Sequence, residues 1–210
     1  MSRKEVPQER EEISPEEGRF LVNLSREAIS RYLSKNVVMQ PPPETPRNLL
    51  KRRGVFVTLR SHPSEELRGC IGFPEPSEKL VKATITAAIE SATGDPRFHP
   101  VTIEELNKEI VLEVSILTAP EEIKAAPKKL ADHVSIGEDG LIVEKGPQRG
   151  LLLPQVATEW GWDREEFLTN CCLKAGLPPD EWLLDGTKVY KFQAVAFKER
   201  APKGLVERAL

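Results

Sequence analysis

Apolar residues alternate with polar ones in some runs of this chain and recur at helical spacing in others. Four runs predict strands, at Val55 to Arg60, Leu67 to Phe73, Ile110 to Leu117 and Lys188 to Lys198. A polar turn at residues 61–66 separates the first two runs, so together they predict a hairpin.

Capping boxes begin three of the predicted helices, at Ser14, Thr102 and Asp163, each with a glutamate three residues later. A fourth helix is predicted from Glu78 to Ala92, where apolar residues recur three and four positions apart. Helices and hairpins are mixed along the chain without regular β-α-β alternation. This order predicts an α+β fold with an antiparallel sheet.

The chain divides into three predicted parts. Residues 1–13 are charged and are predicted to form a disordered tail. The last strand is expected to rejoin the sheet, so residues 14–118 and 155–210 would form a larger subdomain. Residues 119–154 would form a smaller α+β lobe, with short strands joined at turns near residues 138–140 and 146–150.

Composition excludes several classes of protein. The 210 residues are 39% hydrophobic and 30% charged, with a net charge of −3, which argues against a dedicated nucleic-acid binder. Three cysteines form no closed disulfide set, so reduced thiols and a cytoplasmic location are expected. No apolar run approaches the ~20 residues that span a bilayer. The sequence contains no metal-binding, P-loop or dinucleotide motif, so no metal and no cofactor are predicted.

The segment Leu67-Arg68-Gly69-Cys70-Ile71-Gly72 carries the main chemical signal. Glycine within a strand marks a bulge or a close approach by another backbone or a ligand, so Gly69 and Gly72 indicate such an approach. A nearby cation favours the thiolate, which is the reactive form of Cys70. Two interpretations remain open, because free cysteine is also among the most buried residue types. Cys70 is either a nucleophile or a small core residue.

Three charged residues are candidates for ligand contact near this motif. Arg68 shares a strand face with Cys70 and would hold a carboxylate or phosphate, unless an acidic side chain pairs with it. Asp95 and Arg97 lie in a loop stiffened by two prolines, a common setting for binding groups. Asp95 would otherwise only shape the turn.

Two further positions complete the candidate site. Glu113 interrupts an apolar strand and would be a semi-buried acid or base with a raised pKa if a second layer covers its face. Gln155 would lie in the first turn of a helix that begins at Pro154, where backbone N–H groups bind anions. Cys171 and Cys172 follow the apolar face of their helix and are predicted to be core residues.

Several of these motifs occur together in one known family. The segments LRGCIGF, DPRFHPVTIEEL, LEVSIL, GLLLPQVA and CLKAGLP follow the order found in the AMMECR-type domain family, and the match runs from about Ser14 to Glu199. The resemblance implies a two-part α+β protein with a cleft, in which the LRGCIG and DPRFHP segments meet. Family members are often encoded beside, or fused to, a Memo-like protein and a radical-SAM protein, so the resemblance implies a partner of that kind.

The sequence favours an intracellular enzyme or enzyme component with a small-molecule cleft around the LRGCIG motif. Cys70 would be the catalytic residue. Substrate contacts would come from Arg68, Gly69, Gly72, Asp95, Arg97, Glu113 and Gln155, and the ligand would be a small anion. The alternative is a non-catalytic adaptor for a Memo-like or radical-SAM partner. An RNA-binding module is a third hypothesis, which the acidic balance disfavours.

Overall fold

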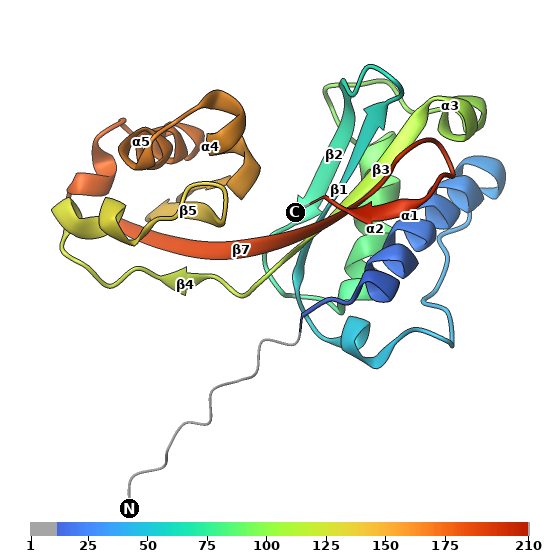
Figure 1. The fold of residues 1–210 in the computed structure, drawn as a ribbon, viewed down its shortest axis with the longest axis horizontal. Coiled ribbons are helices and arrows are strands. Elements are labelled where there is room, and N and C mark those ends of the chain that lie inside the picture. The colour runs from blue at the N-terminus through green and yellow to red at the C-terminus, as the bar shows by residue number, and fades with distance from the viewer. Residues whose placement is uncertain (1–11, 210) are drawn as a thin grey trace, which may run out of the picture.

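An eight-stranded antiparallel sheet organises the protein, and helices cover it at both ends (Figure 1). The computed structural model describes residues 12–209. The strands are β1 (Gly54–Ser61), β2 (Leu67–Phe73), β3 (Ile110–Leu117), β4 (Glu121–Glu122), β5 (Asp139–Lys145), β6 (Gln148–Leu152), β7 (Lys188–Glu199) and β8 (Val206–Arg208). The main path runs β2-β1-β3-β7-β5-β6, and both β4 and β8 also pair with β7.

Three of the α-helices begin at the capping signals expected from the sequence. Ser14, Thr102 and Asp163 each form a complete capping box with a glutamate three residues later. The α-helices are α1 (Pro15–Lys35), α2 (Leu80–Thr93), α3 (Ile103–Lys108), α4 (Pro154–Trp160) and α5 (Arg164–Lys174). The 3₁₀ helices are η1 (Arg47–Leu50), η2 (Pro127–His133) and η3 (Glu181–Leu183). The predicted α+β class is therefore confirmed.

Strand β7 belongs to both parts of the molecule. Its first half pairs with β5, from Lys188 opposite Glu144 to Gln193 opposite Asp139. Its second half pairs with β3 and β8. Figure 1 shows β7 as one long strand that passes from the smaller group of helices to the larger one.

Two large hydrophobic clusters define these two parts. The first lies between α1, α2 and the inner face of β1 and β3, and it includes Leu21, Ile29, Val57, Ile85 and Val114. The second lies between α5, β5 and the start of β7. A third, smaller cluster joins the parts, because Leu117 and Phe56 of the larger one pack with Ile142 and Leu153 of the smaller one.

The clusters divide the chain differently from the expected boundary of 119–154. Helices α4 and α5 pack in the second cluster through Ala157, Phe167 and Cys171, so they lie with the smaller lobe rather than with residues 14–118. The expected turn at residues 138–140 is already the start of β5. Of the expected tail at 1–13, residues 1–11 lie outside the described residues, and Ile13 is buried in the first cluster.

Candidate functional site

Three polar side chains line up across neighbouring strands on the sheet face that points away from α1 and α2. Thr58 of β1 lies directly opposite Cys70 of β2 on one side and Glu113 of β3 on the other. Lys198 of β7 extends the row, since it lies opposite Glu113. Directly opposite residues share one face and bring their Cβ atoms to about 4.5–5.5 Å. We call these four residues the cross-strand row.

The glycines of the motif let β2 pack tightly against its neighbours. A Cβ atom on Gly69 would lie 2.1 Å from the backbone oxygen of Ser91 in α2, and one on Gly72 would lie 2.2 Å from the ring of Phe56. The Ser91 hydroxyl also accepts a hydrogen bond from the N–H of Ile71 at 2.8 Å and donates to the carbonyl of Val57 at 2.7 Å. Packing thus accounts for both glycines, and it fixes the strand that carries Cys70.

Asp95 ties the DPRFHP loop to the motif. Its side chain is 2% exposed and accepts a hydrogen bond from the N–H of Cys70 at 2.9 Å. Arg97 donates to the same carboxylate from Nε at 2.9 Å and from Nη2 at 2.7 Å. These hydrogen bonds from Arg97 hold the pKa of Asp95 well below its usual value, despite the opposing effect of burial. The two signature segments therefore meet, and Asp95 does more than shape a turn.

Arg68 makes the second link between the two segments. Its Nε donates to Glu105 of α3 at 2.6 Å, and its Nη1 donates to the carbonyl of His99 at 2.9 Å. The Phe98 ring lies near both guanidinium groups, 5.9 Å from that of Arg68 and 5.4 Å from that of Arg97. Each arginine is already paired with a carboxylate, so neither is an uncompensated cation waiting for an anionic ligand.

Cys70 is half-buried and carries a protonated thiol at neutral pH. Burial raises the pKa of the Cys70 thiol, while a hydrogen bond from the Thr58 hydroxyl, at 3.3 Å from Sγ, and the charge of Arg97 lower it less. A neighbouring cation, Arg97, does favour the thiolate, but desolvation is the larger effect and the pKa of Cys70 is raised overall. Among the described residues, Thr58 makes the only side-chain hydrogen bond to this sulfur, and no histidine serves it as a base.

Glu113 is the semi-buried carboxylate that the sequence suggested. Burial raises the pKa of Glu113, the charges of Arg60 and Lys198 lower it, and the charge of Glu159 raises it further. Glu159 belongs to α4 of the smaller lobe. Leu153, the residue before α4, packs in one cluster with Phe56 of β1, two residues from Thr58, so the start of α4 lies on the same side of the sheet as the cross-strand row.

Gln155 lies one helical turn before Glu159, on the same face of α4. Its Oε1 atom is buried and has no hydrogen-bond partner. The expected anion site at this helix start does not follow from the structure, because α4 is a single short helix of 7 residues. Gln155 instead contributes a buried acceptor that has no partner among residues 12–209.

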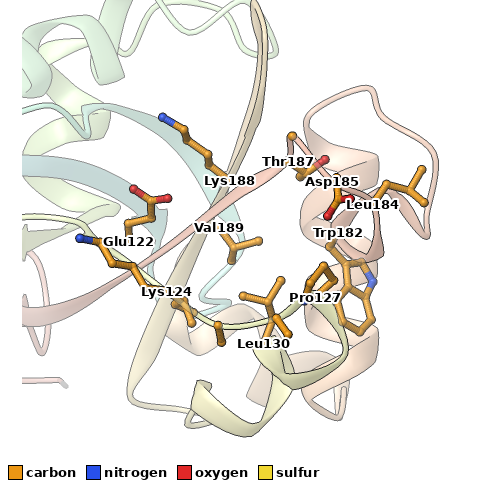
Figure 2. Close-up of a pocket in the computed structure, with 14 residues that line it drawn as sticks. Glu122, Lys124, Pro127, Leu130, Trp182, Leu184, Asp185, Thr187, Lys188 and Val189 are labelled. Carbon is orange, nitrogen blue, oxygen red and sulfur yellow. The ribbon is translucent and has the colours of Figure 1, made fainter.

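One cavity lies elsewhere, in the smaller lobe (Figure 2). It has a volume of about 460 Å³ and an apolar floor that includes Leu130, Trp182 and Val189. Lys124 and Lys188 extend from its rim in the same direction (Figure 2). None of the predicted site residues lines this cavity.

Two searches of residues 12–209 bear on the class of site. No three histidine, cysteine or acidic side chains come together in a way that would hold a metal ion. No helix in this range is long and apolar enough to cross a membrane.

Cys171 and Cys172 are fully buried core residues, as expected, and burial raises the pKa of Cys171 to about 12.

Sequence reasoning missed four residues of this region: Thr58, Glu105, Glu159 and Lys198. Thr58 and Lys198 join the row only through strand register, which the sequence does not state. Glu105 was recognised as part of a capping box, and its carboxylate also pairs with Arg68. Glu159 gave no signal, because nothing in the sequence places α4 against the sheet.

The chain is similar to several proteins of known sequence or structure. The chain is 56% identical to protein PF1979 of Pyrococcus furiosus over 199 residues, which covers 93% of this chain and 94% of the relative. It is 52% identical to protein MJ0810 of Methanocaldococcus jannaschii over 198 residues, with 93% and 96% covered. The crystal structure of the uncharacterized protein PH0010 from Pyrococcus horikoshii superimposes with a TM-score of 0.89 at 54% identity, covering 93% of this chain and 98% of that one.

The family match extends over both parts of the molecule. It covers residues 22–197, from α1 to the second half of β7, and so includes the LRGCIG motif, the DPRFHP loop and α4. The resemblance seen in the sequence motifs is thereby confirmed. The chain belongs to the AMMECR1 family.

Proposed function

We propose that this protein is an enzyme, or a component of one, that acts on a small molecule held against the cross-strand row. The observation that carries the proposal is the register that sets Cys70, Thr58 and Glu113 side by side on adjacent strands. These are a thiol, a hydroxyl and a carboxyl group on one face of the sheet. Clusters of titratable groups with perturbed pKa values are typical of active sites.

The shifted pKa values of Cys70 and Glu113 suggest a separate role for each group in the reaction. Glu113, with a raised pKa, would donate or accept a proton closer to neutral pH than an ordinary glutamate does. Cys70 would be the nucleophile or covalent carrier, and its thiol would have to lose a proton during the reaction because burial keeps it protonated in the free protein. Asp95 would hold the backbone of Cys70 in place through its N–H.

A protection experiment tests the proposal without a known substrate. Native protein is treated with iodoacetamide in the presence of either the small-molecule or the macromolecular fraction of a cell extract, and labelling of Cys70 is read by mass spectrometry. We expect the small-molecule fraction to protect Cys70 or to leave an adduct on it, and the Cys70→Ser variant to lack that adduct. Protection by the macromolecular fraction alone would reject the enzyme proposal.

A second candidate function is a non-catalytic adaptor, favoured by the exposed DPRFHP loop. Arg97 is 53% exposed, and the Phe98 ring is held near two guanidinium groups, so the loop offers a rigid surface. The partner would be a Memo-like or radical-SAM protein, as the family resemblance implies. Calorimetry with such a purified partner would separate the candidates, because an adaptor loses binding in Phe98→Ala and keeps it in Cys70→Ser.

A further inference from the structure

We infer that Glu65, in the turn of the β1–β2 hairpin, is a positioning residue that keeps Glu113 of the cross-strand row without an ion-pair partner. It acts by holding the cations that would otherwise pair with Glu113. The inference rests on the proposed function, because Glu113 is the acid–base group of that site. It goes further by naming the part of the molecule that controls this group.

Strand register brings a cation close to Glu113. Lys198 of β7 lies directly opposite Glu113 of β3 in an antiparallel pair. Opposite charges in that arrangement attract each other and stabilise a sheet. Lys198 nevertheless forms its ion pair with Glu65, which lies 133 positions away in the chain. Among residues 12–209, Glu113 itself forms no ion pair.

Glu65 also holds a second cation near the row. The Nη1 atom of Arg60 donates a hydrogen bond to the backbone carbonyl of Glu65 at 3.1 Å. Arg60 lies two residues after Thr58 on β1, so its side chain belongs to the same face of the sheet as the row. Glu65 therefore binds one cation through its side chain and another through its main chain.

The charges around Glu113 show what this arrangement achieves. Five titratable groups have an electrostatic effect on Glu113 or receive one from it: Arg60 of β1, Cys70 of β2, Lys198 of β7, Glu159 of α4 and Glu65 of the turn. Only two of the five are cations, and Glu65 holds both. A cation paired directly with Glu113 would favour its carboxylate and lower its pKa. Glu65 thereby keeps the pKa of Glu113 closer to neutral pH, where proton transfer is most efficient.

The backbone of the turn has an unusual shape that presents Glu65 to both cations. Glu65 has a φ of 61°, in the left-handed region, which is uncommon for glutamate. Its N–H donates to the carbonyl of Ser61 at 2.8 Å, and the N–H of His62 donates to the carbonyl of Glu109 at 2.6 Å. Glycine would adopt this conformation at less cost but would lack the carboxylate. Strained residues of this kind occur at functional sites more often than elsewhere.

Titration of Glu113 by NMR tests the inference in the free protein. The side-chain carboxyl carbons of glutamate are labelled with ¹³C, and Glu113→Gln identifies the signal of Glu113. We expect the titration midpoint of Glu113 to move to lower pH in Glu65→Gln, because Lys198 loses its partner and pairs with Glu113. The control is Glu66→Gln in the same turn, whose carboxylate accepts a hydrogen bond from the Ser64 hydroxyl at 3.3 Å. This control should move the midpoint far less.

A second background separates the transfer of Lys198 from the simple loss of the Glu65 charge. That loss alone also lowers the pKa of Glu113, but this direct effect does not require Lys198. In Lys198→Met, the further change Glu65→Gln should therefore move the midpoint much less than it does in the unaltered protein. Equal shifts in both backgrounds, or an unchanged midpoint in Glu65→Gln, would overturn the inference. Either result leaves the enzyme proposal to its own test, the protection of Cys70 by small molecules.

Discussion

Replacing Asp95 by asparagine removes one charge from the point where the two signature segments meet. The carboxylate accepts four hydrogen bonds, one from the N–H of Cys70 and three from the backbone and guanidinium of Arg97. Asparagine has nearly the same shape but only one acceptor oxygen. Its amide group would turn two donors toward the donors that now bind the second oxygen.

The expected cost follows from these contacts. A hydrogen bond to a charged group contributes about 1.5–3 kcal/mol. The one acceptor oxygen of asparagine retains the hydrogen bonds on its side of the group. The Arg97 side chain is 53% exposed, so water can replace the hydrogen bonds that its guanidinium loses. The full cost of about 3–5 kcal/mol for breaking a buried ion pair therefore does not apply. We expect a loss of about 2 kcal/mol in the free energy of unfolding, which lowers Tm by about 4–8 °C in a chain of this length.

Urea unfolding as a function of pH measures this cost and identifies its origin. The pKa of Asp95 is lowered on folding, from a usual value of 3.8. Its charge therefore stabilises the native state fully above the unfolded-state pKa, and that contribution is lost as the pH falls below this value toward the folded-state pKa. The difference between the unaltered protein and Asp95→Asn should be constant from pH 5 to pH 8 and shrink only below about pH 4.

The matched control is Asp132→Asn, which breaks an exposed pair with Lys129 at 3.3 Å. Its cost should stay below about 1 kcal/mol. The reasoning is refuted if Asp95→Asn is as stable as the unaltered protein at pH 7, or if the two variants lose the same amount. A difference that changes between pH 6 and pH 8 would assign the effect to another group.

Three further predictions concern the thiol, the hairpin and the buried ion pair. The pH midpoint for alkylation of Cys70 should lie above the ~8.5 of a free thiol. The midpoint should move down in Glu113→Gln, because the charge of Glu113 raises the pKa of Cys70. An unmoved midpoint would mean that Cys70 and Glu113 do not share a site. Gly69→Ala should lower the free energy of unfolding in urea by about 1–3 kcal/mol, because its Cβ would lie 2.1 Å from a backbone oxygen of α2. An unchanged free energy of unfolding would show that β2 can shift to make room. Arg26→Ala should lose about 3–5 kcal/mol in the same assay, because its carboxylate partner Glu199 is 1% exposed. Arg31→Ala, which breaks an exposed ion pair, should lose under about 1 kcal/mol. Equal losses would contradict the role of burial.

Much of the fold followed from local signals in the sequence. The strands Leu67–Phe73 and Ile110–Leu117 have the predicted bounds, and the three capping boxes form as expected. These features depend on a few adjacent residues. The meeting of LRGCIG and DPRFHP was also expected, although only through the family resemblance.

The features that the sequence did not reveal depend on contacts between distant segments. The place of α4 and α5 in the smaller lobe depends on packing with β5, and the sequence of a helix does not say which strands it will pack against. The ionisation of Cys70 depends on a balance between desolvation and the charge of Arg97, and the residue list alone does not say which is larger. Thr58 has no unusual sequence context, and only its register with Cys70 and Glu113 makes it part of the site.

The protonation of the site in the free protein also bears on how it would bind a ligand. Burial raises the pKa of both Cys70 and Glu113, so each group is harder to ionise here than in water. An anionic ligand beside them would add to that difficulty, whereas a cationic ligand would make ionisation of Glu113 more favourable, so that binding would release a proton. Proton uptake or release when a charged small molecule binds, measured by calorimetry in two buffers of different ionisation enthalpy, would thus link the sign of the ligand charge to the acid–base role of Glu113.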